Sequence, residues 1–272
     1  MMSGFLAYGF VQRGLLAGSL VAAACALIGV FLVLKRLSLI GDGMSHVCLT
    51  GVAVALLTSS NPVYMSVPVV VLSSLGIMKI TQKFKIYGDA AIGIVSAAGL
   101  SIGLLITAFA GGFNTDLLGY LFGSILTVSW DEVLLCGILL AAVLGGLRFF
   151  YRDLTSACFD EPFARTRGVP VRIVNTALVA VTSVAVVLAF KVVGIFLISA
   201  MLIIPPVSAL LVSHTFKQVL VCAACFGVAS VWLGVYLSFL FNIPSGATII
   251  LVNLLVLAGC YIYAKVGGSD AR

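Results

Sequence analysis

Two residues that could bind a metal ion, Asp42 and His46, lie in the otherwise apolar stretch SLIGDGMSHVCLTG. An ionised Asp at the centre of a membrane helix costs about 2.5–3.5 kcal/mol on insertion scales, so a charge here needs a partner or a wet cavity. Residues four apart on an α-helix lie about 40° apart in projection, so Asp42 and His46 share one face. Ser38 and Ser45 are expected to widen this polar face. Because carboxylate and imidazole suit zinc or manganese, and copper(I) prefers sulfur, we predict that Asp42 and His46 are metal ligands.

This pair cannot complete a metal site alone, because zinc takes about four ligands and manganese about six. Two copies of the chain that met about an axis normal to the membrane would bring two Asp/His pairs together. The structural alternative is a carboxylate hydrogen-bonded to an imidazole, with no contact to a substrate. The other carboxylates are expected at or beyond the membrane ends, which leaves Asp42 and His46 as the only buried ionisable groups. His214 is expected to be exposed at a turn beside Lys217, outside the metal set.

The elements that must hold this pair are membrane helices. Hydrophobic residues make up 62% of the 272 residues and charged residues 9%, which no soluble domain with an ordinary polar surface sustains. We therefore predict an all-α polytopic membrane protein. Because Pro205 and Pro206 interrupt one of its apolar runs, the predicted number of transmembrane helices is eight to nine. Apolar runs of about 20 residues, long enough to cross a bilayer, cover residues 10–34, 39–58, 62–80, 89–110, 132–150, 173–190, 192–213, 219–241 and 247–264.

The distribution of basic residues predicts how these helices are oriented. With nine crossings and the N-terminus outside, 13 of the 15 Lys and Arg residues fall in inner connections, and only Arg13 and Lys191 fall outside. The positive-inside rule then places the C-terminus and the loop 152–172 in the cytoplasm. Residues 117–128 are apolar but too few to cross, and we predict a re-entrant or interfacial helix there.

Patterns typical of enzymes are missing from the sequence. It contains no GxxxxGK[ST], so any ATP must be hydrolysed by a partner subunit, and it contains no HExxH. Ser45 and His46 are neighbours that point about 100° apart on a helix, so they cannot serve as nucleophile and base of an intramembrane hydrolase. Gly99 and Gly103 are expected to let their helix approach a neighbour closely. We therefore expect a transport protein that catalyses no covalent step.

Four segments carry a family resemblance: SLIGDGMSHVCLTGVAVALL, DLLGYLFGSILTVS, VVGIFLISAMLIIPPVSALLVS and NIPSGATIILVNLLVL. In this order they resemble the permeases of the zinc/manganese family of bacterial ABC importers, over nearly the whole chain. Asp42 and His46 match the Asp and His of the family's second-span motif. Gly43 stands where Thr or Ala often follows the Asp, which is expected to loosen the helix slightly. The segment LFGSILTVS resembles zinc-uptake members more closely than manganese ones.

The resemblance implies a type II ABC importer permease-like fold, in which residues 1–272 form a single transmembrane permease domain of the bacterial plasma (inner) membrane. It implies three partners: a dimer of cytoplasmic ATP-binding subunits, an extracytoplasmic metal-binding solute-binding protein, and a second permease chain, as a homodimer or a paralogue. It implies no tightly bound cofactor, and Zn²⁺ or Mn²⁺ as the transported ion, with zinc favoured.

The resemblance also extends to the larger vitamin B12 and siderophore permeases, which places the ATPase-coupling segment at residues 205–218. There Pro205 and Pro206 are predicted to break the seventh helix, so that a short helix follows and docks on the ATPase. The loop 152–172 is expected to add contacts. Two other functions stay open: a secondary transporter in which Asp42 and His46 exchange protons for metal ions without ATP, and an ABC permease for a metal chelate such as a siderophore or cobalamin.

Overall fold

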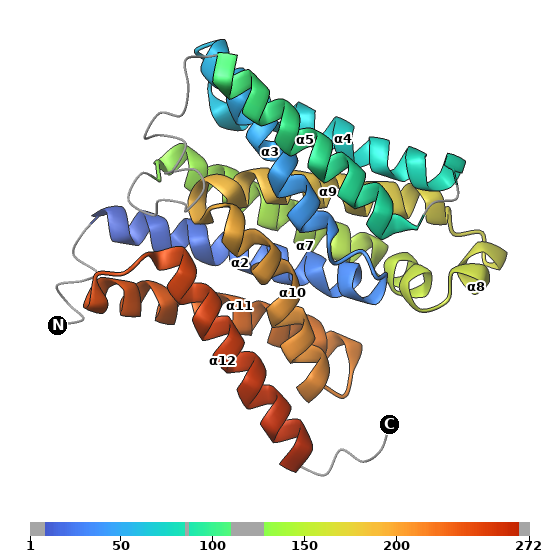
Figure 1. Cartoon of the computed structure of the whole chain (residues 1–272). Helices are drawn as coiled ribbons and strands as arrows, with labels where there is room; N and C mark the ends of the chain where they lie inside the picture. Colours follow the sequence, from blue (N-terminus) through green and yellow to red (C-terminus); the bar gives the residue numbers. More distant parts are fainter. Residues whose placement is uncertain (1–8, 85–86, 110–127, 267–272) are drawn as a thin grey trace.

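The computed structural model describes residues 9–84, 87–109 and 128–266, and every regular element in these ranges is an α-helix (Figure 1). Eight of the helices are long and apolar enough to cross a membrane by length and composition, and α10 is a shorter apolar helix. The predicted all-α fold with eight to nine membrane helices is confirmed. The described helices are α2 (Gly9–Leu34), α3 (Ile40–Leu57), α4 (Pro62–Phe84), α5 (Gly88–Phe109), α7 (Trp130–Phe159), α8 (Glu161–Thr166), α9 (Val171–Val193), α10 (Ile195–Val212), α11 (Phe216–Phe241) and α12 (Ser245–Val266).

Helix α7 begins and ends outside the apolar run that predicted it. At its start, the Ser129 hydroxyl accepts a hydrogen bond from the Glu132 N–H, and the Glu132 carboxylate accepts one from the Ser129 N–H. This capping box satisfies two N–H groups that have no partner inside the helix. At its end, α7 continues past residue 150 to Phe159, because an amphipathic helix can extend beyond the apolar layer where hydropathy no longer reveals it. The predicted re-entrant segment lies, for residues 117–127, outside the described ranges.

Helix α10 runs from Ile195 to Val212 with Pro205 and Pro206 inside it, so the prediction that the double proline breaks this helix is wrong. A proline removes the N–H that would bond the carbonyl four residues earlier. For Pro206 that carbonyl belongs to Leu202, and it lies against Gly29 of α2, where an added Cβ would overlap the Leu202 oxygen. Membrane bundles tolerate helical prolines where a neighbouring helix covers the freed carbonyl in this way.

Helix α3 is held closely by α5 and α4. A Cβ added at Gly99 of α5 would lie 2.9 Å from the Val47 Cα, and one added at Gly103 would lie 3.0 Å from the Thr50 backbone nitrogen. The Thr50 hydroxyl donates a hydrogen bond to the Gly99 carbonyl oxygen at 2.5 Å. The expected close approach through Gly99 and Gly103 is confirmed, and it fixes one side of the helix that carries Asp42 and His46.

Three connections that carry basic residues lie at one end of the bundle. They are residues 35–39, residues 160–170 with α8, and residues 213–217, and Figure 1 shows them toward the right of the view. We call these three segments the basic end. That the basic end faces the cytoplasm stays a prediction of the positive-inside rule.

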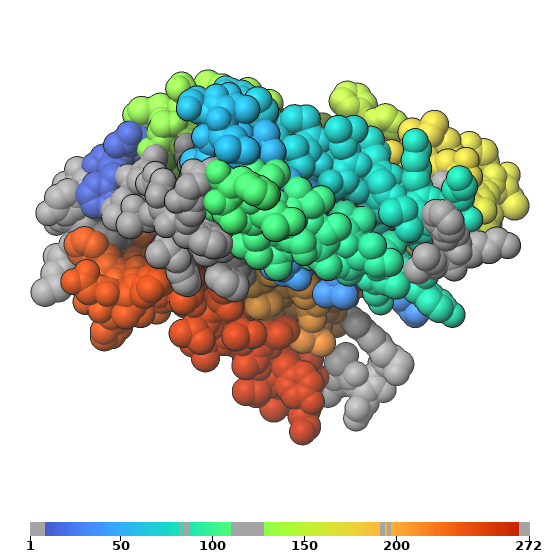
Figure 2. All heavy atoms as spheres, turned by 45° about the horizontal axis from the view of Figure 1, so that its top comes forward, coloured from blue at the N-terminus to red at the C-terminus, as the bar shows by residue number. Residues whose placement is uncertain are grey.

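Helix α12 projects from the opposite flank of the bundle from α4 and α5. Both views show its C-terminal half extending away from the other helices (Figures 1 and 2). Its exposed side chains include Leu255, Tyr261 and Ile262. Such an apolar surface suits contact with lipid or with another membrane chain.

Candidate metal site

Asp42 and His46 lie in the first two turns of α3, as their spacing predicted. The His46 Nε2 is 3.8 Å from the Asp42 Oδ2, and 31% of the His46 side chain and 50% of the Asp42 side chain are exposed. This separation is too long for a hydrogen bond, so the hydrogen-bonded pair of the structural alternative is not formed. Two ligands of one ion lie about 3–3.5 Å apart when each bond is about 2.1 Å long. Small rotations would therefore bring both groups onto one ion.

Asp42 lies near the start of its helix, as it does in the apolar run 39–58 that predicted this helix. It is an acidic residue of the first turn of α3, which begins at Ile40. The N-terminal end of a helix carries a partial positive charge that stabilises a carboxylate by about 0.3–1 kcal/mol. The cost of a charge at the centre of a membrane helix therefore does not apply in full, because Asp42 lies at the start of its helix.

Of the two serines expected to widen this face, Ser45 does not. Ser45 is fully buried, and its hydroxyl donates a hydrogen bond to the Asp42 carbonyl oxygen at 2.6 Å. Ser38 lies in the turn that precedes α3. The expectation was wrong for Ser45 because a serine in a helix satisfies its hydroxyl on the backbone of its own preceding turn. The polar face of α3 is thus the Asp42 and His46 side chains.

The face is bounded by two neighbouring helices. A Cβ on Gly41 would overlap the Leu202 side chain of α10, and a Cβ on Gly43 would lie 2.6 Å from the Ile92 Cγ2 of α5. Because successive helical residues point about 100° apart, Asp42 projects between these two packed positions. Gly43 therefore does more than loosen the helix, since its missing side chain lets α5 pack beside the Asp/His face.

The pair has no third ligand in the part of the chain that the structure describes. No group of three or more His, Cys, Asp or Glu side chains occurs among the described residues. The His46 Nδ1 is buried and has no hydrogen-bond partner among them, whereas Nε2 faces Asp42. Nε2 is therefore the ring nitrogen that could bind an ion. Any further His, Cys, Asp or Glu ligand has to come from outside the described residues, and a second chain or water could also supply a ligand.

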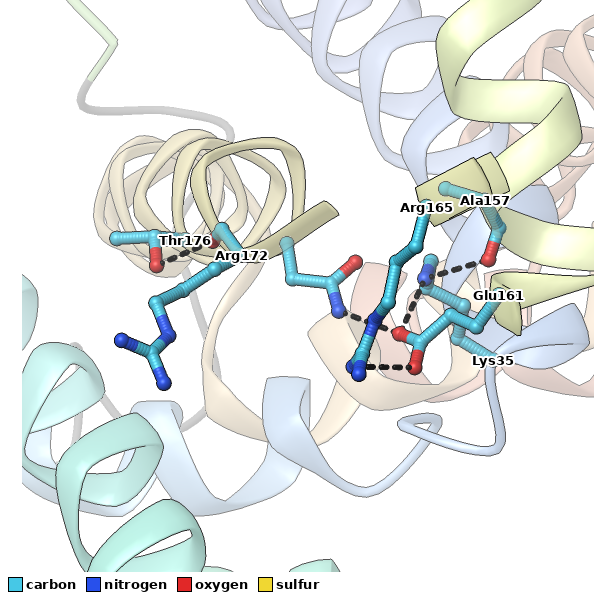
Figure 3. A network of polar contacts seen from close by, with 7 residues as sticks. Lys35, Ala157, Glu161, Arg165, Arg172 and Thr176 are labelled. Carbon is cyan, nitrogen blue, oxygen red and sulfur yellow. Dashed lines mark hydrogen bonds and ion pairs between the residues drawn. The ribbon is translucent and has the colours of Figure 1, made fainter. Parts of the chain in front are cut away.

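The sequence did not reveal a second ionic cluster, at the basic end. The Lys35 side chain is only 6% exposed, and its Nζ donates a hydrogen bond to the Ala157 carbonyl oxygen at 2.9 Å and lies 3.6 Å from the Glu161 Oε1 (Figure 3). Asp42 and His46 are thus not the only ionisable groups taken out of water. Sequence reasoning used Lys35 only as a marker of topology, and nothing local in the sequence signals a partner in a loop so distant along the chain.

The two segments predicted to contact an ATPase both reach the basic end. Residues 205–218 form the end of α10, a short turn and the start of α11, so no separate short helix follows the double proline. Within 152–172, α8 is such a helix: the Asp160 side chain accepts a hydrogen bond from the Phe163 N–H, and Gly168 ends it at a φ of 80°. His214 is exposed at the α10–α11 turn, as expected.

The described helices and the Asp/His pair are typical of a class of proteins: membrane-embedded subunits with a candidate pathway for a metal ion. The chain belongs to the ABC 3 transport family, whose model matches residues 7–264. It is a permease of the ABC metal-importer class.

Similar proteins support this assignment over the whole chain. The manganese transport system membrane protein MntC of Listeria innocua is 32% identical over 267 residues, which cover 98% of this chain and 95% of the relative. A probable iron transport system membrane protein of Haemophilus influenzae is 32% identical over 263 residues, 96% of each chain. The structure of PsaBC from Streptococcus pneumoniae in complex with Fab matches with a TM-score of 0.86 and 28% identity, covering 98% of this chain and 100% of that one.

Proposed function

We propose that the chain imports a divalent transition metal as the permease subunit of an ATP-driven importer, with Asp42 and His46 as ligands in the pathway. The observation that carries this proposal is the open pair at the start of α3, which offers an ion one carboxylate oxygen and one ring nitrogen 3.8 Å apart. Ionisable residues in membrane helices usually mark the path of an ion or a proton.

An incomplete ligand set suits transport. An ion must bind well enough to leave its hydration shell in part and weakly enough to be released on the other side. Two protein ligands, with water completing the coordination sphere, meet both demands better than a closed site of four. Alternating access would expose the pair first to one side of the membrane and then to the other, while the ATP chemistry takes place in the partner subunits.

A second permease chain completes the proposed pathway. The Asp/His face is open between α5 and α10, and no further His, Cys, Asp or Glu joins it from the described residues. A two-fold axis along this face would add a second carboxylate and a second imidazole. We propose a pair of permease chains, identical or paralogous, with an extracytoplasmic binding protein that delivers the metal.

Manganese and zinc are the two candidate ions. The sequence favours zinc through LFGSILTVS, a segment that for the most part falls outside the described residues. The relative from Listeria innocua is named for manganese and the one from Haemophilus influenzae for iron. These names outweigh one short segment, so we propose Mn²⁺ as the first ion to test and Zn²⁺ as the second.

The partner ATPases are proposed to dock on the basic end, which would then face the cytoplasm together with the C-terminus. Both segments predicted for this contact, 205–218 and 152–172, reach this end. Helix α8 supports the second of them, because it is a separate helix with an exposed Phe163 side chain, and the Arg167 side chain that follows it is exposed as well. A short exposed helix is a common element for docking into a groove of a partner.

Uptake of radiolabelled manganese and zinc by cells tests the proposal. Asp42→Asn and His46→Ala are each expected to lower uptake by at least about ten-fold, because a ligand of the ion is lost. The chain provides a matched control: Asp89→Asn changes the first-turn carboxylate of α5. This control is expected to transport normally. Unchanged uptake in Asp42→Asn and His46→Ala at normal expression would refute the metal-ligand role.

The same assay separates an ABC importer from a proton-coupled carrier. An inactive partner ATPase is expected to abolish uptake, whereas collapse of the proton gradient at a constant ATP level is expected to leave it unchanged. The reverse result would favour the secondary transporter, in which Asp42 and His46 release protons as the metal binds.

A further inference from the structure

Lys35 is a buried cation that holds three parts of the chain together. It directly follows α2, and its Nζ reaches the Ala157 carbonyl oxygen of α7 and the Glu161 carboxylate of α8. Lysine is rarely buried unless its charge is paired. The long side chain therefore ties the end of α2 to the segment in which α7 ends and α8 begins.

Glu161 is the centre of this network. Its Oε1 accepts a hydrogen bond from the Asn175 Nδ2 of α9 at 2.9 Å, and its Oε2 lies 3.4 Å from the Arg165 Nη2 one turn along α8 (Figure 3). The contact with Lys35 reaches the end of α2, whereas the contact with Arg165 stays within α8. The Lys35–Glu161 contact therefore links α8 to the end of α2, and the Glu161–Arg165 contact links two residues of α8.

Helix α8 has an inner and an outer side. Ala164 is buried on the inner side, in a small cluster with Ala157 of α7 and with Val171 and Val174 of α9. Phe163 and Arg165 are exposed on the outer side. A push on the outer side would therefore be passed to α7 and α9 by packing and to α2 by the Lys35 link.

Backbone hydrogen bonds order the turn that follows Lys35 as far as the start of α3, the helix that carries Asp42 and His46. The Leu37 N–H donates to the Leu32 carbonyl oxygen at 2.8 Å, and the Arg36 N–H donates to the Val33 carbonyl oxygen at 3.1 Å. This is a Schellman motif, and Arg36 takes its left-handed position with a φ of 58°. The Ile40 N–H then donates to the Leu37 carbonyl oxygen at 3.0 Å as α3 begins. A turn bonded in this way moves as a unit with the first turn of α3, which holds Asp42.

We propose that Lys35 is a positioning residue that couples α8 to the Asp42/His46 pair, so that the Lys35–Glu161 contact sets how much metal is moved for each ATP hydrolysed. The inference rests on the proposed function, because it takes the partner ATPases to act on α8. Lys35 does not touch the metal. It transmits the movement of α8 to the turn that carries the metal ligands.

The test uses the complete importer, reconstituted in proteoliposomes with its ATPase and binding protein. Metal uptake and ATP hydrolysis are measured in the same vesicles for the wild type, Lys35→Met, Glu161→Gln and the double variant. Each single variant is expected to keep ATP hydrolysis and to lower the metal moved per ATP by about five-fold, the lower end of allosteric coupling. The double variant is expected to resemble the single ones, because one contact is lost in each case.

Arg148→Gln is the control, since it removes an exposed cation of α7 that lies outside both segments proposed to contact the ATPases, and the metal moved per ATP is expected to be unchanged. Lys35→Arg keeps the charge and is expected to recover most of the ratio. A ratio that stays at the wild-type value in Lys35→Met and Glu161→Gln would overturn the inference, as would a parallel loss of uptake and hydrolysis in both. If the wild type shows no ATP-driven uptake, the proposed function itself fails, which is a different outcome.

Discussion

The α2–α3 turn has an ionic cluster on each side, and the two clusters differ in how far this chain completes them. On the α2 side, the Lys35 ammonium has a carboxylate and a carbonyl oxygen as partners and is almost fully buried. On the α3 side, Asp42 and His46 stand 3.8 Å apart, partly exposed, with the buried His46 Nδ1 lacking a partner among the described residues. Only five residues separate the last turn of α2 from the first turn of α3. The two clusters therefore differ in how complete they are although they lie close together along the chain.

The difference indicates what each cluster is for. A buried charge with its partners in place holds elements in one arrangement, because breaking the pair leaves a charge without compensation. An open pair of metal ligands holds nothing in place, and it gains its partners only when an ion or a second chain arrives. The fold thus sets a closed cluster, which can transmit a movement, directly beside an open one, which can bind and release a cation.

The largest effect is expected from a substitution that breaks the closed cluster around Lys35. Glu161→Lys would put a second cation beside the buried Lys35, and we expect it to destabilise the chain by about 3 kcal/mol, the low end for a broken buried pair because Glu161 is itself 39% exposed. Thermal unfolding of the detergent-purified importer would show this as a Tm lower by several degrees. Asp42→Asn is expected to cost less than about 1 kcal/mol, the contribution of the helix start. If Asp42→Asn proved the more destabilising change, the open pair would be a structural element and the contrast would fail.

A somewhat smaller effect comes from supplying the open cluster with its ion. Mn²⁺ or Zn²⁺ at about 100 times its dissociation constant is expected to stabilise the folded importer by about 2.7 kcal/mol, because the ion binds only the folded state. Thermal unfolding with and without metal measures this shift. It is expected to vanish in the Asp42→Asn/His46→Ala double variant and to remain in Asp89→Asn. A shift that survives in the double variant would place the ion elsewhere in the protein.

The parts that the sequence predicted are those that depend on local patterns. Apolar runs of membrane length predicted the helices, and four-residue spacing predicted the shared face of Asp42 and His46, because both follow from helix geometry alone. The double proline was misjudged because its effect depends on Gly29, which lies on another helix and accommodates the freed Leu202 carbonyl.

The Lys35 cluster was missed for a related reason. Its partners, Ala157 and Glu161, lie far along the chain. The sequence around a lysine that follows an apolar run is the same whether its side chain reaches solvent or contacts a distant segment. The flexible stem of lysine allows both. Ion pairs between distant segments are therefore visible only once the helices have been placed in space.

The smallest expected effect concerns the turn between the clusters. Arg36 adopts a left-handed backbone conformation, which costs a residue with a Cβ about 1–2 kcal/mol. Arg36→Gly removes this cost but adds about 0.5–1 kcal/mol of backbone entropy to the unfolded chain, so we expect a net stabilisation of at most about 1.5 kcal/mol. Arg36→Ala keeps the backbone cost and is expected to leave stability unchanged. Thermal unfolding of the two variants side by side measures the difference, and a Tm for Arg36→Gly below that of Arg36→Ala would mean that backbone strain is not what distinguishes this turn.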